Sequence, residues 1–515
     1  MIIRHIRPPD YAAFDRRRRM ERQPVGRRLM SVSASLMFAV IAIDLAQVKA
    51  ESPTNTKPLR IGLRKQLLVD DFVIDNMQNL TRELGRVTKA NGGKPIFTEG
   101  WFYGTVLHDA GRFKMWYRLP GSKGYGCAES KDGIRFRKTA KISGINFAGD
   151  YTLSVTIDPH ETDSKHRYKA AYDAPGMAAG LAYSADGIRW TPYNKGKPVT
   201  HRAADTYNQI IWDADAKVYR LFTRTDFGTG GGAGEWHGTR SMTSPDVKAN
   251  PAKWKLVRNW VFQKTGKKKE RHRRQVYALT DWIYHGVHFA LISVYEWPGD
   301  LSEGGPDLKK RHERDVMNFY IATSRDGDRW DLRWVYAGKP MIPRGRNGAF
   351  DKDIIMPAST VITHGDKHWL YYGGANERHG TEKVRLPRKH AIGLATLRLD
   401  GFVFLKAGTK EGVLVTKPFR LDGNTLEINI DAKADKGEFR VEALDATGKS
   451  ISGYAGQHAI VFRNADSLRF RPRWKGASDL SALQGKMIRL KFHLRRSKLY
   501  AFQIVKSKDR GHDDS

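Results

Sequence analysis

The sequence predicts an all-β chain, with a five-bladed β-propeller followed by a C-terminal β-sandwich. The first observation is a repeated segment: Ser184-Ala-Asp-Gly-Ile-Arg-Trp190 has near-copies at 130–136 and 324–330. The second is another motif in phase with it, made of an apolar strand, a polar turn and an aromatic-rich strand. The third is that no long segment shows the 3.6-residue period of a helix, which argues against a helical solenoid.

Each motif predicts a hairpin. Asp-Gly is a tight-turn dipeptide because Gly supplies positive φ and Asp caps its own turn. An aromatic residue after the turn and apolar residues before it give the two arms one buried face. The second motif occurs at 104–118, 153–172, 209–224, 277–295 and 358–373. Two hairpins per repeat make a four-stranded antiparallel unit, and units of that size repeated radially are propeller blades.

The composition of the chain changes after Gly408. Four segments then alternate apolar and polar residues, and turns such as Asp422-Gly423 separate them. This pattern is typical of an antiparallel sandwich. We therefore expect a propeller at 62–408 and a β-sandwich at 409–506.

The first 50 residues have the features of a signal peptide. Arginines precede an apolar run at 29–43, and Val48-Lys-Ala50 places small residues where a signal peptidase cleaves. The run is too short for a comfortable membrane span. We expect a secreted or periplasmic protein whose mature chain begins near Glu51 and keeps no stable membrane span. An N-terminal anchor that is not cleaved is the alternative.

Charge and cysteine content bound the function. The chain has 89 Lys+Arg against 55 Asp+Glu and a formal net charge of +34, which favours polyanionic surroundings or serves solubility. Cys127 is the single cysteine, so an intramolecular disulfide is excluded. No pair of histidines has a zinc-site spacing with a carboxylate partner, and no nucleic-acid motif is present. We expect no metal, no cofactor, no nucleic-acid partner and a monomer.

Candidate site residues stand where each blade begins. The first strand of a blade lines the central channel, so residues at or just before it can point at one ligand. These residues are Glu99, Asp150, Asp205, Arg274, Asp351 and Asp353. Carboxylates that gather repel one another, so such a ring is explained by a bound polyol, a metal ion or a pair of catalytic acids. Turn capping is the alternative explanation for any one of them.

Further residues are candidates for substrate binding. Arg224, Arg240 and Arg274 could bind carboxylate or sulfate groups as bidentate forks. Trp101 could stack on a sugar face. A glycine-rich insertion carries Glu235 and His237, and long loops in compact domains are often functional.

The five repeats, the acids before the first strands and the trailing sandwich resemble the invertase/arabinanase superfamily of five-bladed propeller glycosidases (glycoside hydrolase families 32, 43 and 68). The resemblance implies that three acids from the first three blades act as nucleophile or base, transition-state stabiliser and general acid. The matching positions are Glu99, Asp150 and Asp205. They match by position, since the chain lacks the superfamily's W-M-N-D-P-N-G, R-D-P and E-C motifs.

These observations predict an exported glycoside hydrolase-like protein that acts on a carbohydrate, with an anionic glycan among the candidates. Two alternatives stay open. One is a non-catalytic propeller that binds a glycan or another polyanion. The other is a sialidase-like hydrolase, which needs an arginine cluster and a tyrosine nucleophile in the channel. Whether the chain is an enzyme stays open too.

Overall fold

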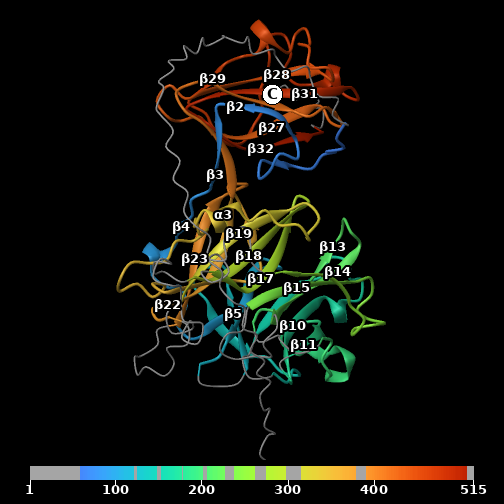
Figure 1. The fold of residues 1–515 in the computed structure, drawn as a ribbon, viewed down its shortest axis with the longest axis vertical. Helices are drawn as coiled ribbons and strands as arrows, with labels where there is room; N and C mark the ends of the chain where they lie inside the picture. The colour runs from blue at the N-terminus through green and yellow to red at the C-terminus, as the bar shows by residue number, and fades with distance from the viewer. Residues whose placement is uncertain are drawn as a thin grey trace, which may run out of the picture. The chain divides into compact units, whose positions relative to one another are not determined.

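A computed structural model describes residues 58–120, 124–147, 152–176, 178–200, 206–226, 237–260, 274–296, 315–378 and 390–506 (Figure 1). The expected signal peptide at 1–50 lies outside these residues. The described chain is all-β, and its helical elements are the short helix α3 (Arg333–Tyr336) and five 3-10 turns: η1 (Asn91–Gly93), η2 (Ser164–His166), η3 (Tyr193–Gly196), η7 (Gly456–His458) and η8 (Ser481–Leu483). Within the described ranges, no helix is long and apolar enough to cross a membrane.

Three four-stranded antiparallel sheets follow one another along the chain. Each joins its strands in sequence order, which is the arrangement of consecutive hairpins. The first contains β5 (Trp101–Asp109), β6 (Arg112–Arg118), β7 (Tyr125–Ser130) and β8 (Arg137–Lys141). The second contains β9 (Leu153–Ile157), β10 (Tyr168–Ala174), β11 (Ala178–Ser184) and β12 (Thr191–Pro192). The third contains β13 (Gln209–Asp213), β14 (Val218–Asp226), β15 (His237–Ser244) and β16 (Lys255–Trp260), drawn in green in Figure 1. Such sheets are consistent with a propeller.

An eight-stranded sheet comes next. Its strands are β17 (Arg274–Tyr284), β18 (Val287–Glu296), β19 (Val316–Ser324), β20 (Ile354–Pro357), β21 (Ile362–His364), β22 (Lys367–Ala375), β23 (His390–Arg398) and β4 (Thr88–Lys89). One parallel bridge, between Met317 and Ile354, joins β19 to β20. At the far edge, β4 from the N-terminal part of the chain pairs with β23.

The repeated Ser-x-Asp-Gly segments form equivalent turns. In each, the Ser hydroxyl donates to the Asp carboxylate and accepts from the Asp and Gly backbone N–H groups. Oδ1 of the same Asp accepts from the two N–H groups after the Gly, at 2.8–3.0 Å. These bonds lower the pKa of Asp132, with the N–H of Arg135 as the largest cause. Asp132, Asp186 and Asp326 therefore occupy equivalent turns, as the repeated Asp-Gly dipeptides predict, and their carboxylates serve the turn structure.

The Gly of each turn packs on a neighbouring sheet. A Cβ on Gly187 would lie 2.7 Å from the ring of Trp116 in β6, and one on Gly133 would lie 2.7 Å from Trp369 in β22. A Cβ on Gly327 would lie 2.8 Å from Arg220 in β14. The repeated sequence is therefore required by packing between sheets as well as by the turn.

Aspartates at the C-terminal ends of the first strands join neighbouring sheets. Asp109, which ends β5, accepts from Arg167 and from Tyr168 of β10. Asp158, just after β9, accepts from Tyr219 of β14 at 2.7 Å. The Arg167 guanidinium is the main reason that the pKa of Asp109 is lowered. These buried acids hold sheets together.

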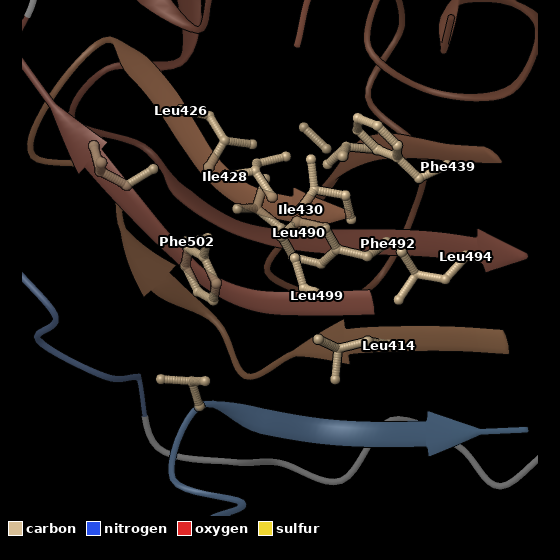
Figure 2. Close-up of a cluster of buried hydrophobic side chains, with 14 of the residues drawn as sticks. Leu414, Leu426, Ile428, Ile430, Phe439, Leu490, Phe492, Leu494, Leu499 and Phe502 are labelled. Atoms are coloured by element: carbon tan, nitrogen blue, oxygen red, sulfur yellow. The ribbon is translucent and has the colours of Figure 1, made fainter. Parts of the chain in front are cut away.

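Two six-stranded sheets share the largest described core. The first contains β1 (Gln66–Leu67), β3 (Leu80–Leu84), β24 (Val403–Ala407), β27 (Thr425–Asp431), β30 (Asp466–Phe470) and β32 (Lys498–Val505). The second contains β2 (Ile74–Gln78), β25 (Gly412–Thr416), β26 (Phe419–Arg420), β28 (Glu438–Asp445), β29 (Phe462–Arg463) and β31 (Met487–Arg495). Figure 2 shows Ile428 and Phe502 from the first sheet beside Leu490 and Phe492 from the second.

The chain enters these two sheets from both of its ends. β2 pairs with β25 and β3 pairs with β24, so residues 74–84 lie beside residues 403–416. The expected boundary near residue 62 does not separate these early strands from the C-terminal sheets. Alternation in a five-residue strand shows which face is buried but not which distant strand is the partner, so the sequence did not reveal this pairing.

Candidate functional site

Antiparallel pairing brings a set of strand ends together. Arg274 at the start of β17 lies opposite Glu296 at the end of β18, and Glu296 lies opposite Val316 at the start of β19. In the same way Ala375 at the end of β22 lies opposite Ile354 and His390. These strand ends form the candidate site.

Two of the long connections leave from this end of the sheets, whereas the one after β19 (residues 325–353) starts from the other end. β14 ends at Asp226 and β15 begins at His237, while β18 ends at Glu296 and β19 begins at Val316. At the other end, two residues, His285 and Gly286, connect β17 to β18. Long connections at one end of a rigid scaffold are where binding residues usually gather.

Tyrosines and small polar side chains from different sheets meet where the first strands approach one another. The hydroxyls of Tyr103 and Tyr277 are hydrogen-bonded, and the ring of Tyr207 lies 5.6 Å from that of Tyr103. One residue pair further along, Thr105 Oγ1 lies 2.6 Å from Ser359 Oγ. Tyr103 of β5 and Tyr277 of β17 therefore meet between the first strands. Tyrosine is the residue type that the sialidase-like alternative requires in the channel, and the sequence did not locate it there.

Arg274 and Glu296 form a buried ion pair. Arg274 donates from Nε at 3.0 Å and from its terminal nitrogen at 2.9 Å to Glu296 Oε1, and the side chains are 3% and 7% exposed. Glu296 Oε2 accepts from Asn318 at 2.7 Å and from the Tyr320 hydroxyl at 2.6 Å. Since these donors occupy both oxygens, Glu296 orients Arg274 and is not placed to exchange a proton with a ligand.

The two acids before β20 have different surroundings. Asp351 accepts from Lys89 at 2.6 Å and from Tyr372 at 3.0 Å, so it ties β4 to β22. Asp353 is bonded to Lys352 at 2.5 Å, and Arg378 Nε lies 3.9 Å away. Asp351 therefore helps to attach β4 to the eight-stranded sheet. Asp353 lies among cations at the strand ends that form the site.

Trp101 is half-buried at the start of β5, and its ring centroid lies 3.7 Å from that of His390. His390 Nε2 lies 3.0 Å from a carboxylate oxygen of Glu377. The Trp101 ring, the His390 imidazole and the Glu377 carboxylate thus lie next to one another in space. An aromatic ring beside polar groups is suited to contact with a sugar.

The predicted arginines of the third sheet do not share a face. Thr223 lies opposite Arg240 and Arg224 lies opposite Thr239, so the side chains of Arg224 and Arg240 point to opposite sides of the sheet. Arg240 Nε donates to Thr223 Oγ1 at 3.2 Å, and burial lowers the pKa of Arg240. They therefore cannot act as one fork pair on a ligand.

Glu99 lies elsewhere. Its carboxylate is 54% exposed and forms an ion pair with Lys138 of β8, the outermost strand of the first sheet. This contact does not bring it to Arg274 or Asp353. Asp150, Asp205 and Glu235 lie outside the described residues, as does the side chain of His237.

The segments that follow Asp150 and Asp205 are bonded to each other. Asn208 Nδ2 donates to Thr152 Oγ1 at 3.2 Å, and the Thr152 N–H donates to Asp173 Oδ1 at 2.7 Å. All three side chains are buried. The first strands of the second and third sheets, β9 and β13, therefore begin next to each other at the candidate site.

The structure thus brings Trp101, Arg274 and Asp353 to the same strand ends, and it adds Glu296 and Tyr103, which the sequence did not single out. Counting outward from the His285-Gly286 turn would have placed Glu296 opposite Gln275. A β-bulge between Val276 and Ala278 shifts the register by one residue and brings Glu296 opposite Arg274, so the sequence alone does not give this pair. Within the described ranges, no group of three or more His, Cys, Asp or Glu side chains could hold a metal ion.

No protein-family model and no curated protein matches the chain. Solved structures do match, at low identity. A thermostable family-43 glycoside hydrolase matches at 12% identity and a TM-score of 0.40, covering 61% of this chain and 89% of its own. An endo-1,4-beta-xylanase from Bacteroides thetaiotaomicron matches at 10% identity and a TM-score of 0.39, covering 62% and 92%. An N-acetylgalactosamine deacetylase from F. plautii, in complex with blood group B trisaccharide, matches at 13% identity and a TM-score of 0.36, covering 66% and 96%. Similarity of this degree assigns neither a reaction nor a substrate to the chain.

Proposed function

We propose that this chain is an exported glycoside hydrolase that holds a carbohydrate at the strand ends carrying Trp101, Arg274 and Asp353. Asp150 and Asp205 are its acid pair. The single observation that carries the proposal is the Asn208–Thr152 hydrogen bond, because these residues follow Asp205 and Asp150 by three and two positions. Asp150 and Asp205 are therefore close in the chain to two residues that are hydrogen-bonded to each other. Their two carboxylates can act on the same glycosidic bond.

The architecture we propose is a five-bladed propeller with a β-sandwich. The three four-stranded sheets supply three blades. The eight-stranded sheet divides at the single Met317–Ile354 bridge into two more, and β4 completes the last one. The Gly133 turn of the first sheet packs on Trp369 of the last, which supports a closed ring. We place residues 66–84 and 403–505 together in the sandwich, since β1–β3 pair there.

The chemistry needs two carboxylates with different pKa values. One acid stays protonated and gives its proton to the leaving oxygen, while the other acts as nucleophile or activates a water. Arg274, oriented by Glu296, binds a hydroxyl or an anionic substituent, and Trp101 stacks on a sugar ring. Acids separated by about 5–5.5 Å retain anomeric configuration, whereas roughly 6.5–9.5 Å leaves room for a water and inverts it.

The test is hydrolysis of a panel of neutral and anionic polysaccharides, measured as new reducing ends. Asp150→Asn and Asp205→Asn should each remove most of the turnover while the melting temperature stays near that of the wild type. Asp435→Asn, which changes an exposed acid in the C-terminal sheets, is the matched control and should keep full activity. Full activity in both active-site variants would refute the assignment of the acid pair.

A non-catalytic glycan-binding protein is the second candidate, and the saturated hydrogen bonding of Glu296 favours it. It requires that the chain bind a polysaccharide that it does not cleave. Trp101→Ala would then weaken binding. The wild type, Asp150→Asn and Asp205→Asn would all release no new reducing ends. Export is tested separately by N-terminal sequencing of secreted protein, which should begin near Glu51.

A further inference from the structure

A row of cations starts in the edge strand of one C-terminal sheet and continues beyond it. β30 is the last strand of its sheet and pairs with β27 alone among the named strands. Along β30 and just after it, every second side chain is basic and exposed: Arg469, Arg471, Arg473 and Lys475. Alternate side chains of an extended chain point the same way about 7 Å apart. Arg469 lies within β30, Arg471 and Arg473 follow the strand, and Lys475 lies in the turn after them.

The residues between these cations point into the protein. Phe470 packs against the core of the two sheets. Trp474 is 3% exposed, and its Nε1 donates to the Val441 carbonyl at 2.8 Å. The buried anchors fix the backbone of the row, so its charges are held on one side of a rigid edge.

Few carboxylates neutralise the row. Arg471 donates to Glu427 at 2.7 and 3.0 Å, and Arg469 lies 3.3 Å from Asp366 in a pair whose side chains are 54% and 67% exposed. The exposed Arg469–Asp366 pair contributes little and can be exchanged for another anion, whereas Glu427 is only 13% exposed and holds Arg471 more firmly. Among the residues that the structure describes, no acid is bonded to the side chain of Arg473 or Lys475.

A groove continues the row. It has a volume of about 530 Å³ and runs between β30 and the strands β4 and β23, with Arg86, Lys367 and Arg398 among the residues that line it. Arg398 is held by Asp466 at 2.6 Å, whereas Arg86 and Lys367 are exposed. Two carboxylates, Asp366 and Asp466, also line the groove, but the cations of the groove and of residues 469–475 outnumber them. We call these cations the β30 surface.

We propose that the β30 surface binds a linear anionic glycan, so that the substrate of the proposed hydrolase is anionic and is held at a second place on the protein. The choice of a glycan rests on the proposed function. Guanidinium groups bind sulfate and carboxylate as forks, and several of them in succession match the repeated anions of a polysaccharide.

Other polyanions fit the β30 surface less well. Single-stranded nucleic acid is held by aromatic side chains on which bases stack, and the aromatics of this row face the interior. An anionic membrane is held by cations beside exposed apolar residues. Among the described residues, the exposed large apolar side chains are Leu63, Phe72, Leu256, Val257 and Tyr336, and none of them belongs to the row.

The test uses the full chain and calorimetric titration with dextran sulfate, alginate and neutral dextran at several salt concentrations. A variant with Gln at 469, 471, 473 and 475 should lose at least about tenfold in affinity for one or both anionic polymers, with a weaker salt dependence. Dextran sulfate and alginate distinguish sulfate from carboxylate recognition. Neutral dextran should not bind at this surface.

The matched control removes four exposed cations from the turn at 131–135 and from the edge strand β8, with Gln at 131, 135, 137 and 141. It has the same net charge as the first variant and should keep the affinity of the wild type. Equal losses in both variants would show attraction by bulk charge and overturn the proposal. So would tighter binding of a single-stranded oligonucleotide than of dextran sulfate.

A single Arg473→Gln variant guards against misfolding, because that side chain supports no bonded carboxylate among the described residues. It should lose part of the affinity at an unchanged melting temperature, and full affinity would count against the proposal. Polysaccharide hydrolysis is measured on the same variants. If the wild type binds a polysaccharide but does not hydrolyse it, the proposed hydrolase activity is refuted and the β30 surface stands. If the wild type hydrolyses a polysaccharide and the fourfold variant binds it unchanged, the β30 surface is refuted and the hydrolase activity stands.

Discussion

The imidazole of His368 accepts a hydrogen bond at Nε2 from the backbone N–H of Asp400, at 3.0 Å. Its other nitrogen, Nδ1, lies 2.9 Å from the Thr363 hydroxyl. The ring is fully buried and therefore neutral, because a proton on Nε2 would face the N–H that it now accepts from. The Asp400 carboxylate in turn binds Lys65, Tyr284 and Asn429, so this contact lies where the last strands of the eight-stranded sheet meet the C-terminal sheets.

We expect His368 to make stability depend on pH. Burial lowers its pKa from 6.5 to about 4, with Lys65 and His285 acting in the same direction and Asp400 opposing them. As pH falls from 6.5 to 4, the unfolded chain binds a proton that the folded chain refuses, so the free energy of unfolding decreases. The full loss is on the order of 3 kcal/mol, from 1.36 kcal/mol per pKa unit.

Urea unfolding of His368→Gln at pH 7 and pH 4.5 measures this contribution. The variant should be less stable at pH 7 and lose less stability than the wild type on acidification. His458→Gln, at a half-buried histidine, is the control and should follow the wild type. Equal acid losses in His368→Gln and the wild type would rule out this origin of the pH dependence.

The Gly of the repeated turn should tolerate no side chain. Gly187 has φ of +77° and a Cβ there would lie 2.7 Å from the Trp116 ring, whose Nε1 donates to the Gly187 carbonyl. Gly187→Ala should lower the free energy of unfolding by roughly 2–4 kcal/mol, from backbone strain and overpacking together. Thermal and urea unfolding measure it.

Gly176→Ala separates the two causes. Gly176 has φ of +86°, but a Cβ there meets nothing within 4 Å. It should cost only about 1 kcal/mol, the strain alone. A cost for Gly187→Ala no larger than that for Gly176→Ala would mean that Trp116 yields and that the turn does not lock neighbouring sheets.

The local features of this fold could be predicted from sequence, and the long-range pairings could not. The Ser-x-Asp-Gly turn is written in adjacent residues, since a short hydroxyl, a short carboxylate and a Gly with positive φ are all it needs. The partner of Ile74–Gln78 is Gly412–Thr416, and nothing in either strand specifies the other. Such pairing is decided by the complete core that both strands help to close.

The Arg274–Glu296 pair should behave as one unit. Breaking a buried ion pair leaves the remaining charge uncompensated, so Glu296→Gln and Arg274→Met should each cost about 3–5 kcal/mol. The double variant should cost less than the sum, with a coupling on the order of 2 kcal/mol. Urea unfolding of the four proteins measures the cycle, and additive costs would show that other groups carry the two charges.

The candidate site was partly visible in the sequence for the same local reason. Repeat phase located Arg274, Asp353 and Trp101 at strand starts, because the repeat fixes where each first strand begins. It also selected Glu99 and Asp351, whose carboxylates bind Lys138 and Lys89 and serve the sheets instead. Knowing where a strand starts shows at which end of the sheet a side chain lies. The direction in which an acidic side chain points depends on the cations nearby.

Trp101 should contribute to carbohydrate binding more than to stability. The chain offers a comparison, because the Trp212 ring also lies against a histidine, His160, with ring centroids 3.8 Å apart. Both indoles are half-buried, but Trp101 begins β5 while Trp212 lies next to the last residue of β13, at the opposite end of the first strands. Sugar rings stack on exposed indole faces, so Trp101→Ala should weaken binding of a recognised oligosaccharide by about tenfold or more, whereas Trp212→Ala should leave it unchanged. Both variants should show a similar, modest decrease in melting temperature. Titration calorimetry and thermal unfolding on the same preparations decide the matter, and equal losses of affinity in the two variants would place the carbohydrate away from the strand ends that Trp101, Arg274 and Asp353 share.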